Sequence, residues 1–280
     1  MNSYVRLMRL DKPVGIYLLL WPTLWALFLA ADGWPKPDLL LIFTLGVVLM
    51  RSAGCVINDY ADRNIDKFIE RTQYRPITSG EISTANALKT FFGLITVAFG
   101  LVLLTNSLTI QLAVVAVLLA ILYPFTKRWT HLPQFVLGTA FAMSVPMAFA
   151  ATNNFVPVSA WWIFAATVIW TVIYDTMYAM SDREEDIKIG VKSTAVLFAT
   201  YDRLILGLLQ IALILVFFEI SEIFKMSIFF DISILLASTL MVYHQFLIKN
   251  REKTACFKAF LHNNYIGMVI FIGIALSVAQ

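Results

Sequence analysis

Long runs of apolar residues alternate with short polar segments along almost the whole chain. Breaks of Pro, Gly, Asn and charge divide these runs into nine stretches, each close to the roughly 20 residues that cross a bilayer as a helix. The pattern predicts an all-α, polytopic membrane protein, with span ends fixed only to within several residues. Because no room is left for a separate soluble domain, residues 1–280 are predicted to form one integral-membrane domain. The predicted spans are 14–34, 37–57, 87–105, 108–126, 134–152, 160–180, 204–220, 228–248 and 262–279.

Composition supports this class of protein, since 60% of the residues are hydrophobic and only 14% are charged. The net charge of +3 is spread over loops, so it indicates no nucleic-acid partner and its distribution reports topology instead. Cys55 and Cys256 lie far apart, and His131, His244 and His262 form no ligand-spaced pair with them. We therefore expect neither a disulfide framework nor a zinc site.

Basic residues gather in alternate loops, which predicts the orientation of the protein because Lys and Arg favour cytoplasmic loops. The other loops hold only Lys36 and Lys225. The N-terminus is thus predicted to be cytoplasmic and the C-terminus to lie outside. The first apolar run lacks a clear signal-peptide cleavage site, and no Arg- and Ser-rich transit segment precedes it, so a bacterial inner membrane is expected. The basic residues of the N-terminal segment and the predicted cytoplasmic loops are Arg6, Arg9, Lys12, Arg63, Lys67, Arg71, Arg75, Lys89, Lys127, Arg128, Arg183, Lys188, Lys192, Arg203, Lys249, Arg251, Lys253 and Lys258.

The stretch "VINDYADRNID" places a first acidic motif (residues 58–66) at the predicted cytoplasmic end of the second span. Asn58, Asp62 and Asp66 are spaced i, i+4 and i+8, so on a continuing helix they share one face, with Asp59 beside them. Stacked carboxylates repel and need a cation, and oxygen ligands favour a hard ion such as Mg²⁺. Since Mg²⁺ in proteins often binds substrate phosphates, the motif predicts a phosphorylated substrate.

A second acidic motif (residues 175–186) lies about one half-chain later, in "YDTMYAMSDREED". Asp182 and Asp186 repeat the i, i+4 spacing, and Asp175 is expected deeper in the membrane, where an ionisable residue is a candidate functional group. Tyr174 and Tyr178 flank Asp175. The two motifs begin polar segments, 58–86 and 181–203, that are expected to be cytoplasmic loops, and they suggest a weak internal duplication. The alternative is that these aspartates only cap helices or pair with neighbouring bases.

Basic residues near both motifs can supply hydrogen-bond donors to a diphosphate. Positive-inside topology alone would also place bases there, and we assign phosphate contact to Arg71, Arg75, Lys127 and Arg128. Arg51 is different because it lies inside the second span, seven residues before Asn58. It either pairs with Asp175 or binds a carboxylate on a second substrate. A phosphorylated substrate with a long apolar tail among the helices, such as a polyprenyl diphosphate, fits this arrangement.

At these motifs the chain resembles the UbiA superfamily of intramembrane prenyltransferases. "NDYADRNID" matches the NDxxDxxxD motif of that family and "DREED" matches its DxxxD motif. Further segments resemble the bacterial members that prenylate 4-hydroxybenzoate: "RLMRLDKPVGIYLLLWPTLWAL", "YPFTKRWTHLPQ", "SVPMAFAA" and "CFKAFLHNNYIG".

The resemblance implies nine transmembrane helices around a central cavity, with the two motifs facing each other across Mg²⁺ and the diphosphate. It also implies transfer of a polyprenyl group to the ring carbon next to the hydroxyl of 4-hydroxybenzoate, in ubiquinone synthesis. Arg51 would bind the carboxylate of the acceptor, and Asp175 would orient its phenol or help to remove the proton. The implied metal ligands are Asn58, Asp62, Asp66, Asp182 and Asp186, with Asp59 and Tyr178 in support.

Two alternatives stay open at this point. A sister enzyme would share the fold and donor but use naphthoate or haem as acceptor, and the acidic motifs do not separate these. A secondary transporter would instead place coupling-ion aspartates near the bilayer midplane. Here most aspartates fall at span ends on one side of the membrane, which favours a metal-diphosphate site.

Overall fold

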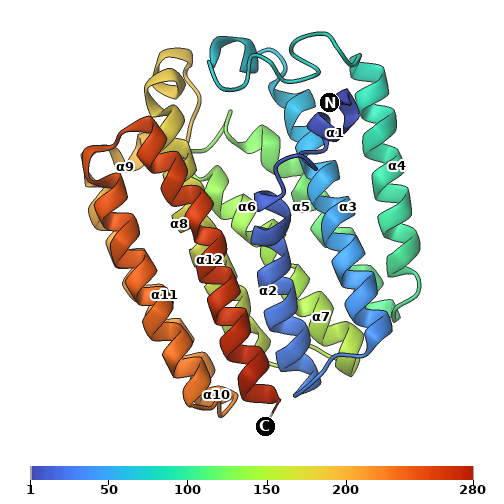
Figure 1. Ribbon diagram of the computed structural model, residues 1–280. Coiled ribbons are helices and arrows are strands. Elements are labelled where there is room, and N and C mark those ends of the chain that lie inside the picture. Colours follow the sequence, from blue (N-terminus) through green and yellow to red (C-terminus); the bar gives the residue numbers. More distant parts are fainter. Residues whose placement is uncertain (1, 280) are drawn as a thin grey trace.

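The structure, a computed structural model, describes residues 2–279, and this part of the chain contains helices and no strands. Nine helical segments of it are long and apolar enough to cross a membrane, which confirms the predicted number and order of spans. Figure 1 shows them running side by side, with α1, α9 and the segment between α3 and α4 at one end and the C-terminus at the other. The α-helices are α1 (Ser3–Leu7), α2 (Val14–Ala31), α3 (Pro37–Asp62), α4 (Thr84–Val102), α5 (Ser107–Thr126), α6 (Pro133–Ala142), α7 (Ser144–Asn153), α8 (Ala160–Ile189), α9 (Thr194–Phe198), α10 (Asp202–Ile223), α11 (Ile228–Leu247) and α12 (Lys253–Val278), with 3-10 turns η1 (Asp66–Phe68), η2 (Ala199–Tyr201) and η3 (Ile248–Asn250).

Local sequence signals explain several helix starts. The side chain of Ser83 accepts a hydrogen bond from the backbone N–H of Asn86 and caps α4. Asn106 caps α5 in the same way through the N–H of Thr109. Pro37 occupies the first turn of α3, where the missing N–H costs no helical hydrogen bond.

The last span begins nine residues before its predicted start, because α12 starts at Lys253. Two further predicted boundaries are wrong, and both bear on the acidic motifs. The segment 181–203, expected to be a loop, is helical as far as Ile189, where Gly190 ends α8 in the left-handed conformation with φ +72°. The helix of the first motif, expected to continue through Asp66, ends at Asp62, and Asp66 begins η1.

The helices form a ring that closes where α12 packs against α2. On one side α2, α8, α10, α11 and α12 bury a continuous core, centred on Trp25 and Trp170, whose rings lie 5.3 Å apart between centroids. The other side, enclosed by α2 to α8 and the start of α12, holds a cavity instead. The densely packed half of the bundle thus holds α8 in place beside the cavity.

Candidate functional site

The cavity has a volume of about 680 Å³ and is lined mainly by apolar side chains of the surrounding helices. Its charged and polar lining comes from the N-terminal segment, α3, α8 and the segment between α3 and α4. These residues include Arg6, Arg9, Asp11, Lys12, Arg51, Asn58, Asp59, Arg71, Arg75 and Asp175. A long apolar space with charges of both signs in its wall suits a ligand with a charged head and a hydrophobic body.

The first acidic motif is assembled across a helix end. Asn58, Asp59 and Asp62 lie in the last two turns of α3, and Asp66 follows in η1. Arg75 brings the separated parts back together, because its Nη1 lies 3.0 Å from Oδ1 of Asp59 and 2.9 Å from Oδ2 of Asp66. Asp59 and Asp66 therefore come together through a shared base and not through one face of a continuous helix.

The second acidic motif lies entirely on α8. Asp175 and Asp186 are buried, and Asp182 between them is partly exposed. Arg71 reaches this motif from the segment after η1, with Nη2 2.5 Å from Oδ2 of Asp182, and its guanidinium lies 4.5 Å from the centre of the Tyr178 ring. Arg71 thus joins the segment that follows the first motif to the helix that carries the second.

Lys127 and Arg128, after the end of α5, behave differently from each other. Lys127 forms an ion pair with Asp62, whereas Arg128 donates to the backbone oxygen of Ala61 at 2.7 Å and stacks over Phe125. The backbone N–H of Lys192 donates to the backbone oxygen of Lys127 at 3.2 Å, which ties this turn to the loop after α8. Three of the four predicted phosphate-binding bases, Arg71, Arg75 and Lys127, therefore contact carboxylates of the acidic motifs, and Arg128 contacts only the backbone of the first motif.

One base at the site, Arg9, was not predicted from the sequence, and its Nη2 lies 2.9 Å from both carboxylate oxygens of Asp59. Arg9 was counted only as part of the basic N-terminal segment, and no spacing rule links it to a residue fifty positions later. The contact places the N-terminal segment at the wall of the cavity.

Burial and charge together set the protonation of the site outside the membrane spans. Burial, with the nearby Asp62 and Asp59, raises the pKa of Asp66 to about 6 even though Arg75 opposes the shift. The pKa of the Arg75 guanidinium is raised despite its burial, because Asp59 and Asp66 favour its charged form. Additional positive charge beside Asp66 would therefore favour its ionised form.

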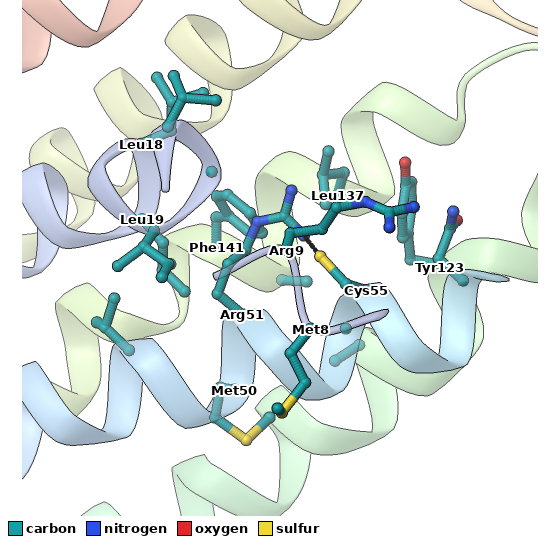
Figure 2. Close-up of a pocket in the computed structure, with 18 of the residues that line it drawn as sticks. Met8, Arg9, Leu18, Leu19, Met50, Arg51, Cys55, Tyr123, Leu137 and Phe141 are labelled. Carbon is teal, nitrogen blue, oxygen red and sulfur yellow. Dashed lines mark hydrogen bonds between the residues drawn. The ribbon is translucent and has the colours of Figure 1, made fainter. Parts of the chain in front are cut away.

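Arg51 and Asp175 both line the cavity, but the ion pair between them that one reading of the sequence predicts is absent. Within residues 2–279, no carboxylate lies within 4.0 Å of a nitrogen of Arg51. Its only hydrogen bond in this range runs from Nη1 to Sγ of Cys55, at 2.8 Å, and buried Nε has no partner. Figure 2 shows this contact as the dashed line between the two side chains. A guanidinium with such a weak acceptor keeps donors free for a ligand.

The acidic motifs fit a hard divalent cation in their chemistry. The available donors are carboxylate and amide oxygens, and buried Oδ1 of Asp62 has no hydrogen-bond partner. In the described part of the chain, no three His, Cys, Asp or Glu side chains converge closely enough for a metal ion, since the carboxylates of Asp62, Asp66 and Asp182 contact bases instead. Binding of a cation at this site would therefore require the bases to leave the carboxylates and to contact the bound ligand instead.

Comparisons with known proteins agree with the fold and with the family resemblance of the sequence. Residues 19–267 match the model of the UbiA prenyltransferase family. A 4-hydroxybenzoate octaprenyltransferase of Vesicomyosocius okutanii subsp. Calyptogena okutanii is 71% identical over 97% of this chain and 99% of its own length. A solved UbiA homologue from Aeropyrum pernix superposes with a TM-score of 0.82 at 21% identity, covering 93% of this chain and 97% of the other. A homologue from Archaeoglobus fulgidus, bound to GPP and Mg²⁺, has a TM-score of 0.73 at 18% identity, over 99% of both chains.

Proposed function

The chain belongs to the UbiA prenyltransferase family, and from this premise we propose that it prenylates 4-hydroxybenzoate. It transfers a polyprenyl group from a polyprenyl diphosphate to the ring carbon ortho to the hydroxyl and releases diphosphate, a membrane step of ubiquinone synthesis. The name of the 71% identical relative supports this acceptor and an octaprenyl donor. The observation that carries the proposal is the meeting of two acidic motifs and three bases beside a largely apolar cavity.

The donor site uses the acidic motifs and their bases. Asn58, Asp62, Asp66, Asp182 and Asp186 would hold Mg²⁺, as the chemistry of their oxygens supports and as the Mg²⁺-bound homologue suggests. When bound, Mg²⁺ neutralises charge on the diphosphate as it leaves. Arg71, Arg75 and Lys127 exchange their carboxylate partners for phosphate oxygens and stabilise the same charge. Arg128 turns from the backbone of Ala61 to do likewise, Asp59 holds Arg75 in place, and the Tyr178 ring supports Arg71.

The acceptor site lies farther from the helix end, at Arg51 and Asp175. Arg51 is seven residues, or about 10 Å, back along α3 from Asn58. Its free donors bind the carboxylate of 4-hydroxybenzoate, and Asp175 orients the phenol or accepts its proton. Electron release from the phenol oxygen makes the ortho carbon nucleophilic. The allylic C–O bond to the diphosphate breaks, a C–C bond forms at that carbon, and the ring then loses its ortho proton.

The bilayer supplies the setting for this reaction. Nine apolar helical segments make the chain a multi-pass membrane protein across its described residues. We propose a bacterial inner membrane, with the N-terminus and the acidic motifs on the cytoplasmic side, from the alternation of basic loops. The octaprenyl tail then extends from the cavity among the helices or into lipid.

Acceptor identity is tested with membranes that contain the protein, octaprenyl diphosphate and Mg²⁺. We expect an ortho-prenylated product from 4-hydroxybenzoate and none from 1,4-dihydroxy-2-naphthoate or haem. Membranes that bind the donor but prenylate only the naphthoate or haem would contradict the acceptor while leaving the family assignment intact.

A further inference from the structure

We propose that Gly15 is a positioning residue that sets the place of the Arg51 guanidinium and so makes the acceptor site selective for an aromatic carboxylate. This inference rests on the proposed function, because the carboxylate is that of the proposed acceptor. Gly15 lies buried in the first turn of α2 and lines the cavity opposite Arg51, which belongs to α3. In the sequence, neither the position of Gly15 nor its residue type indicates that it belongs to a binding site.

The contact between the two residues leaves no room for a side chain at position 15. A Cβ built on Gly15 would lie 2.5 Å from both Nε and Nη2 of Arg51 and 2.8 Å from its Cζ. The guanidinium therefore occupies the volume that any other residue would fill. It rests against the α2 backbone on one side, and Nη1 contacts Cys55 on the other. Gly15 and Cys55 together define one location for the charged end of Arg51.

That location is suited to an incoming anion. Arg51 has no carboxylate partner among residues 2–279, and its Nε is buried without a hydrogen-bond partner. A buried polar group left without a partner is costly, so a ligand that satisfies this guanidinium gains binding energy. A neutral ring in the same place would leave the guanidinium unpaired, which is how a polar site rejects an analogue lacking the matching group.

Gly15 differs in this respect from other closely packed glycines of the chain. A Cβ at Gly267 would lie 2.4 Å from Cδ1 of Trp21 and 2.5 Å from the ring of Trp170. The Trp170 ring is fully buried and the partly buried Trp21 ring packs against the same core, so neither can move aside without disturbing that packing, and Gly267 serves packing. The atoms facing Gly15 are instead the far end of a flexible side chain beside a cavity. Alanine at position 15 is therefore accommodated by moving the guanidinium, at little cost to folding.

The experiment compares 4-hydroxybenzoate with its uncharged methyl ester as acceptors, using kcat/KM with saturating octaprenyl diphosphate and Mg²⁺. Both acceptors keep the phenol and the reactive ring carbon, so their ratio reports recognition of the carboxylate. Gly15→Ala is expected to lower the acid-to-ester ratio about tenfold or more, mainly through KM for the acid, while KM for the donor and the melting temperature stay near wild type. Gly46→Ala is the matched control, because it adds a methyl group to the same cavity with no atom within 4 Å. Its ratio is expected to match the wild type.

A double-mutant cycle shows whether Gly15 acts through Arg51. Once Arg51→Ala has removed the preference for the acid, adding Gly15→Ala should change the ratio no further. An unchanged ratio in the single variant Gly15→Ala, or additive losses in the double variant, would overturn the inference about Gly15 alone. A wild-type protein that binds the donor but makes no product from 4-hydroxybenzoate would overturn the proposed function and this inference together.

Discussion

Replacing Arg75 with Gln should destabilise the ligand-free protein in a way that grows with pH. Nη1 of Arg75 contacts both Asp59 and Asp66, whose carboxylates are buried. Asp59 keeps Arg9 as a partner in the variant, so Asp66 is the carboxylate left uncompensated. Removing one partner of a buried ion pair typically costs about 3–5 kcal/mol. We expect a loss of about 3 kcal/mol in the free energy of unfolding at pH 8.

The pKa of Asp66 gives the pH dependence and its sign. In the folded protein this pKa is raised from 3.8 to about 6, so the fold favours the protonated acid. Stability of the wild type therefore falls as pH rises through this window, by about 3 kcal/mol in all, and the contribution of Asp66 is flat above it. Without Arg75 the pKa rises further, because the main influence lowering it is gone. The variant should thus continue to lose stability between pH 6 and pH 8, where the wild-type contribution of Asp66 no longer changes.

The assay is chemical denaturation in detergent, without divalent cations, at several pH values between 5.5 and 8.5. Arg63→Gln is the matched control, because Arg63 lies in the same segment and forms no ion pair with a carboxylate among the described residues. Its hydrogen bond goes to the backbone oxygen of Tyr60, and its guanidinium lies over the Tyr60 ring. Arg75→Gln should also cost much less in an Asp66→Asn background. The reasoning would be refuted if wild type and Arg75→Gln gave parallel curves, with the same loss at every pH.

Three further substitutions distinguish residues of the candidate site from a residue that only stabilises the fold. Arg71→Lys removes the bidentate contact with Asp182 and the stacking on Tyr178. KM for the prenyl diphosphate should therefore rise about tenfold in transfer assays. An unchanged KM would contradict contact between Arg71 and phosphate. Arg51→Ala should raise KM for 4-hydroxybenzoate by tenfold or more and leave KM for the donor unchanged; equal effects on both would contradict its assignment to the acceptor. Asp202→Ala leaves Arg183 and Arg251 without the carboxylate that they share on the far side of α8. It should cost about 3 kcal/mol of stability in denaturation experiments and leave both KM values unchanged. A rise in only one KM would count against a purely structural role.

Hydropathy and charge were sufficient to predict the spans, because each apolar run has one stable arrangement in lipid. They failed at the polar end of α8, since "DREEDIK" contains four good helix formers, Arg, two Glu and Lys, and its polarity says only that the segment leaves the bilayer. They also failed at Asp66, where periodicity carries no information about the end of α3. Periodicity along the chain shows which residues share a face of a helix, but it does not show at which residue the helix ends.

The sequence predicted which residues belong to the candidate site better than it predicted which of them contact one another. The acidic motifs are identified by residue type and spacing. Arg71, Arg75 and Lys127 are identified as basic residues of loops predicted on the same side of the membrane, and they do contact the motifs. Their partners depend on how distant segments pack, and that also hid the contact between Arg9 and Asp59. Gly15 lies in a segment that carries the family resemblance, but nothing singled it out within that segment, because its contribution is the absence of a side chain facing Arg51.

The most direct test of the central claim is prenyl transfer by the purified protein as a function of Mg²⁺ concentration. Wild type is compared with Asp62→Asn and Asp182→Asn, one from each acidic motif, and with Glu184→Gln, an exposed residue of the same helix as Asp182. We expect Mg²⁺-dependent formation of ortho-prenylated 4-hydroxybenzoate by wild type and Glu184→Gln, and a loss of at least a hundredfold in kcat/KM in both aspartate variants. Transfer that proceeds at the wild-type rate without divalent cations, or in either aspartate variant, would contradict the account.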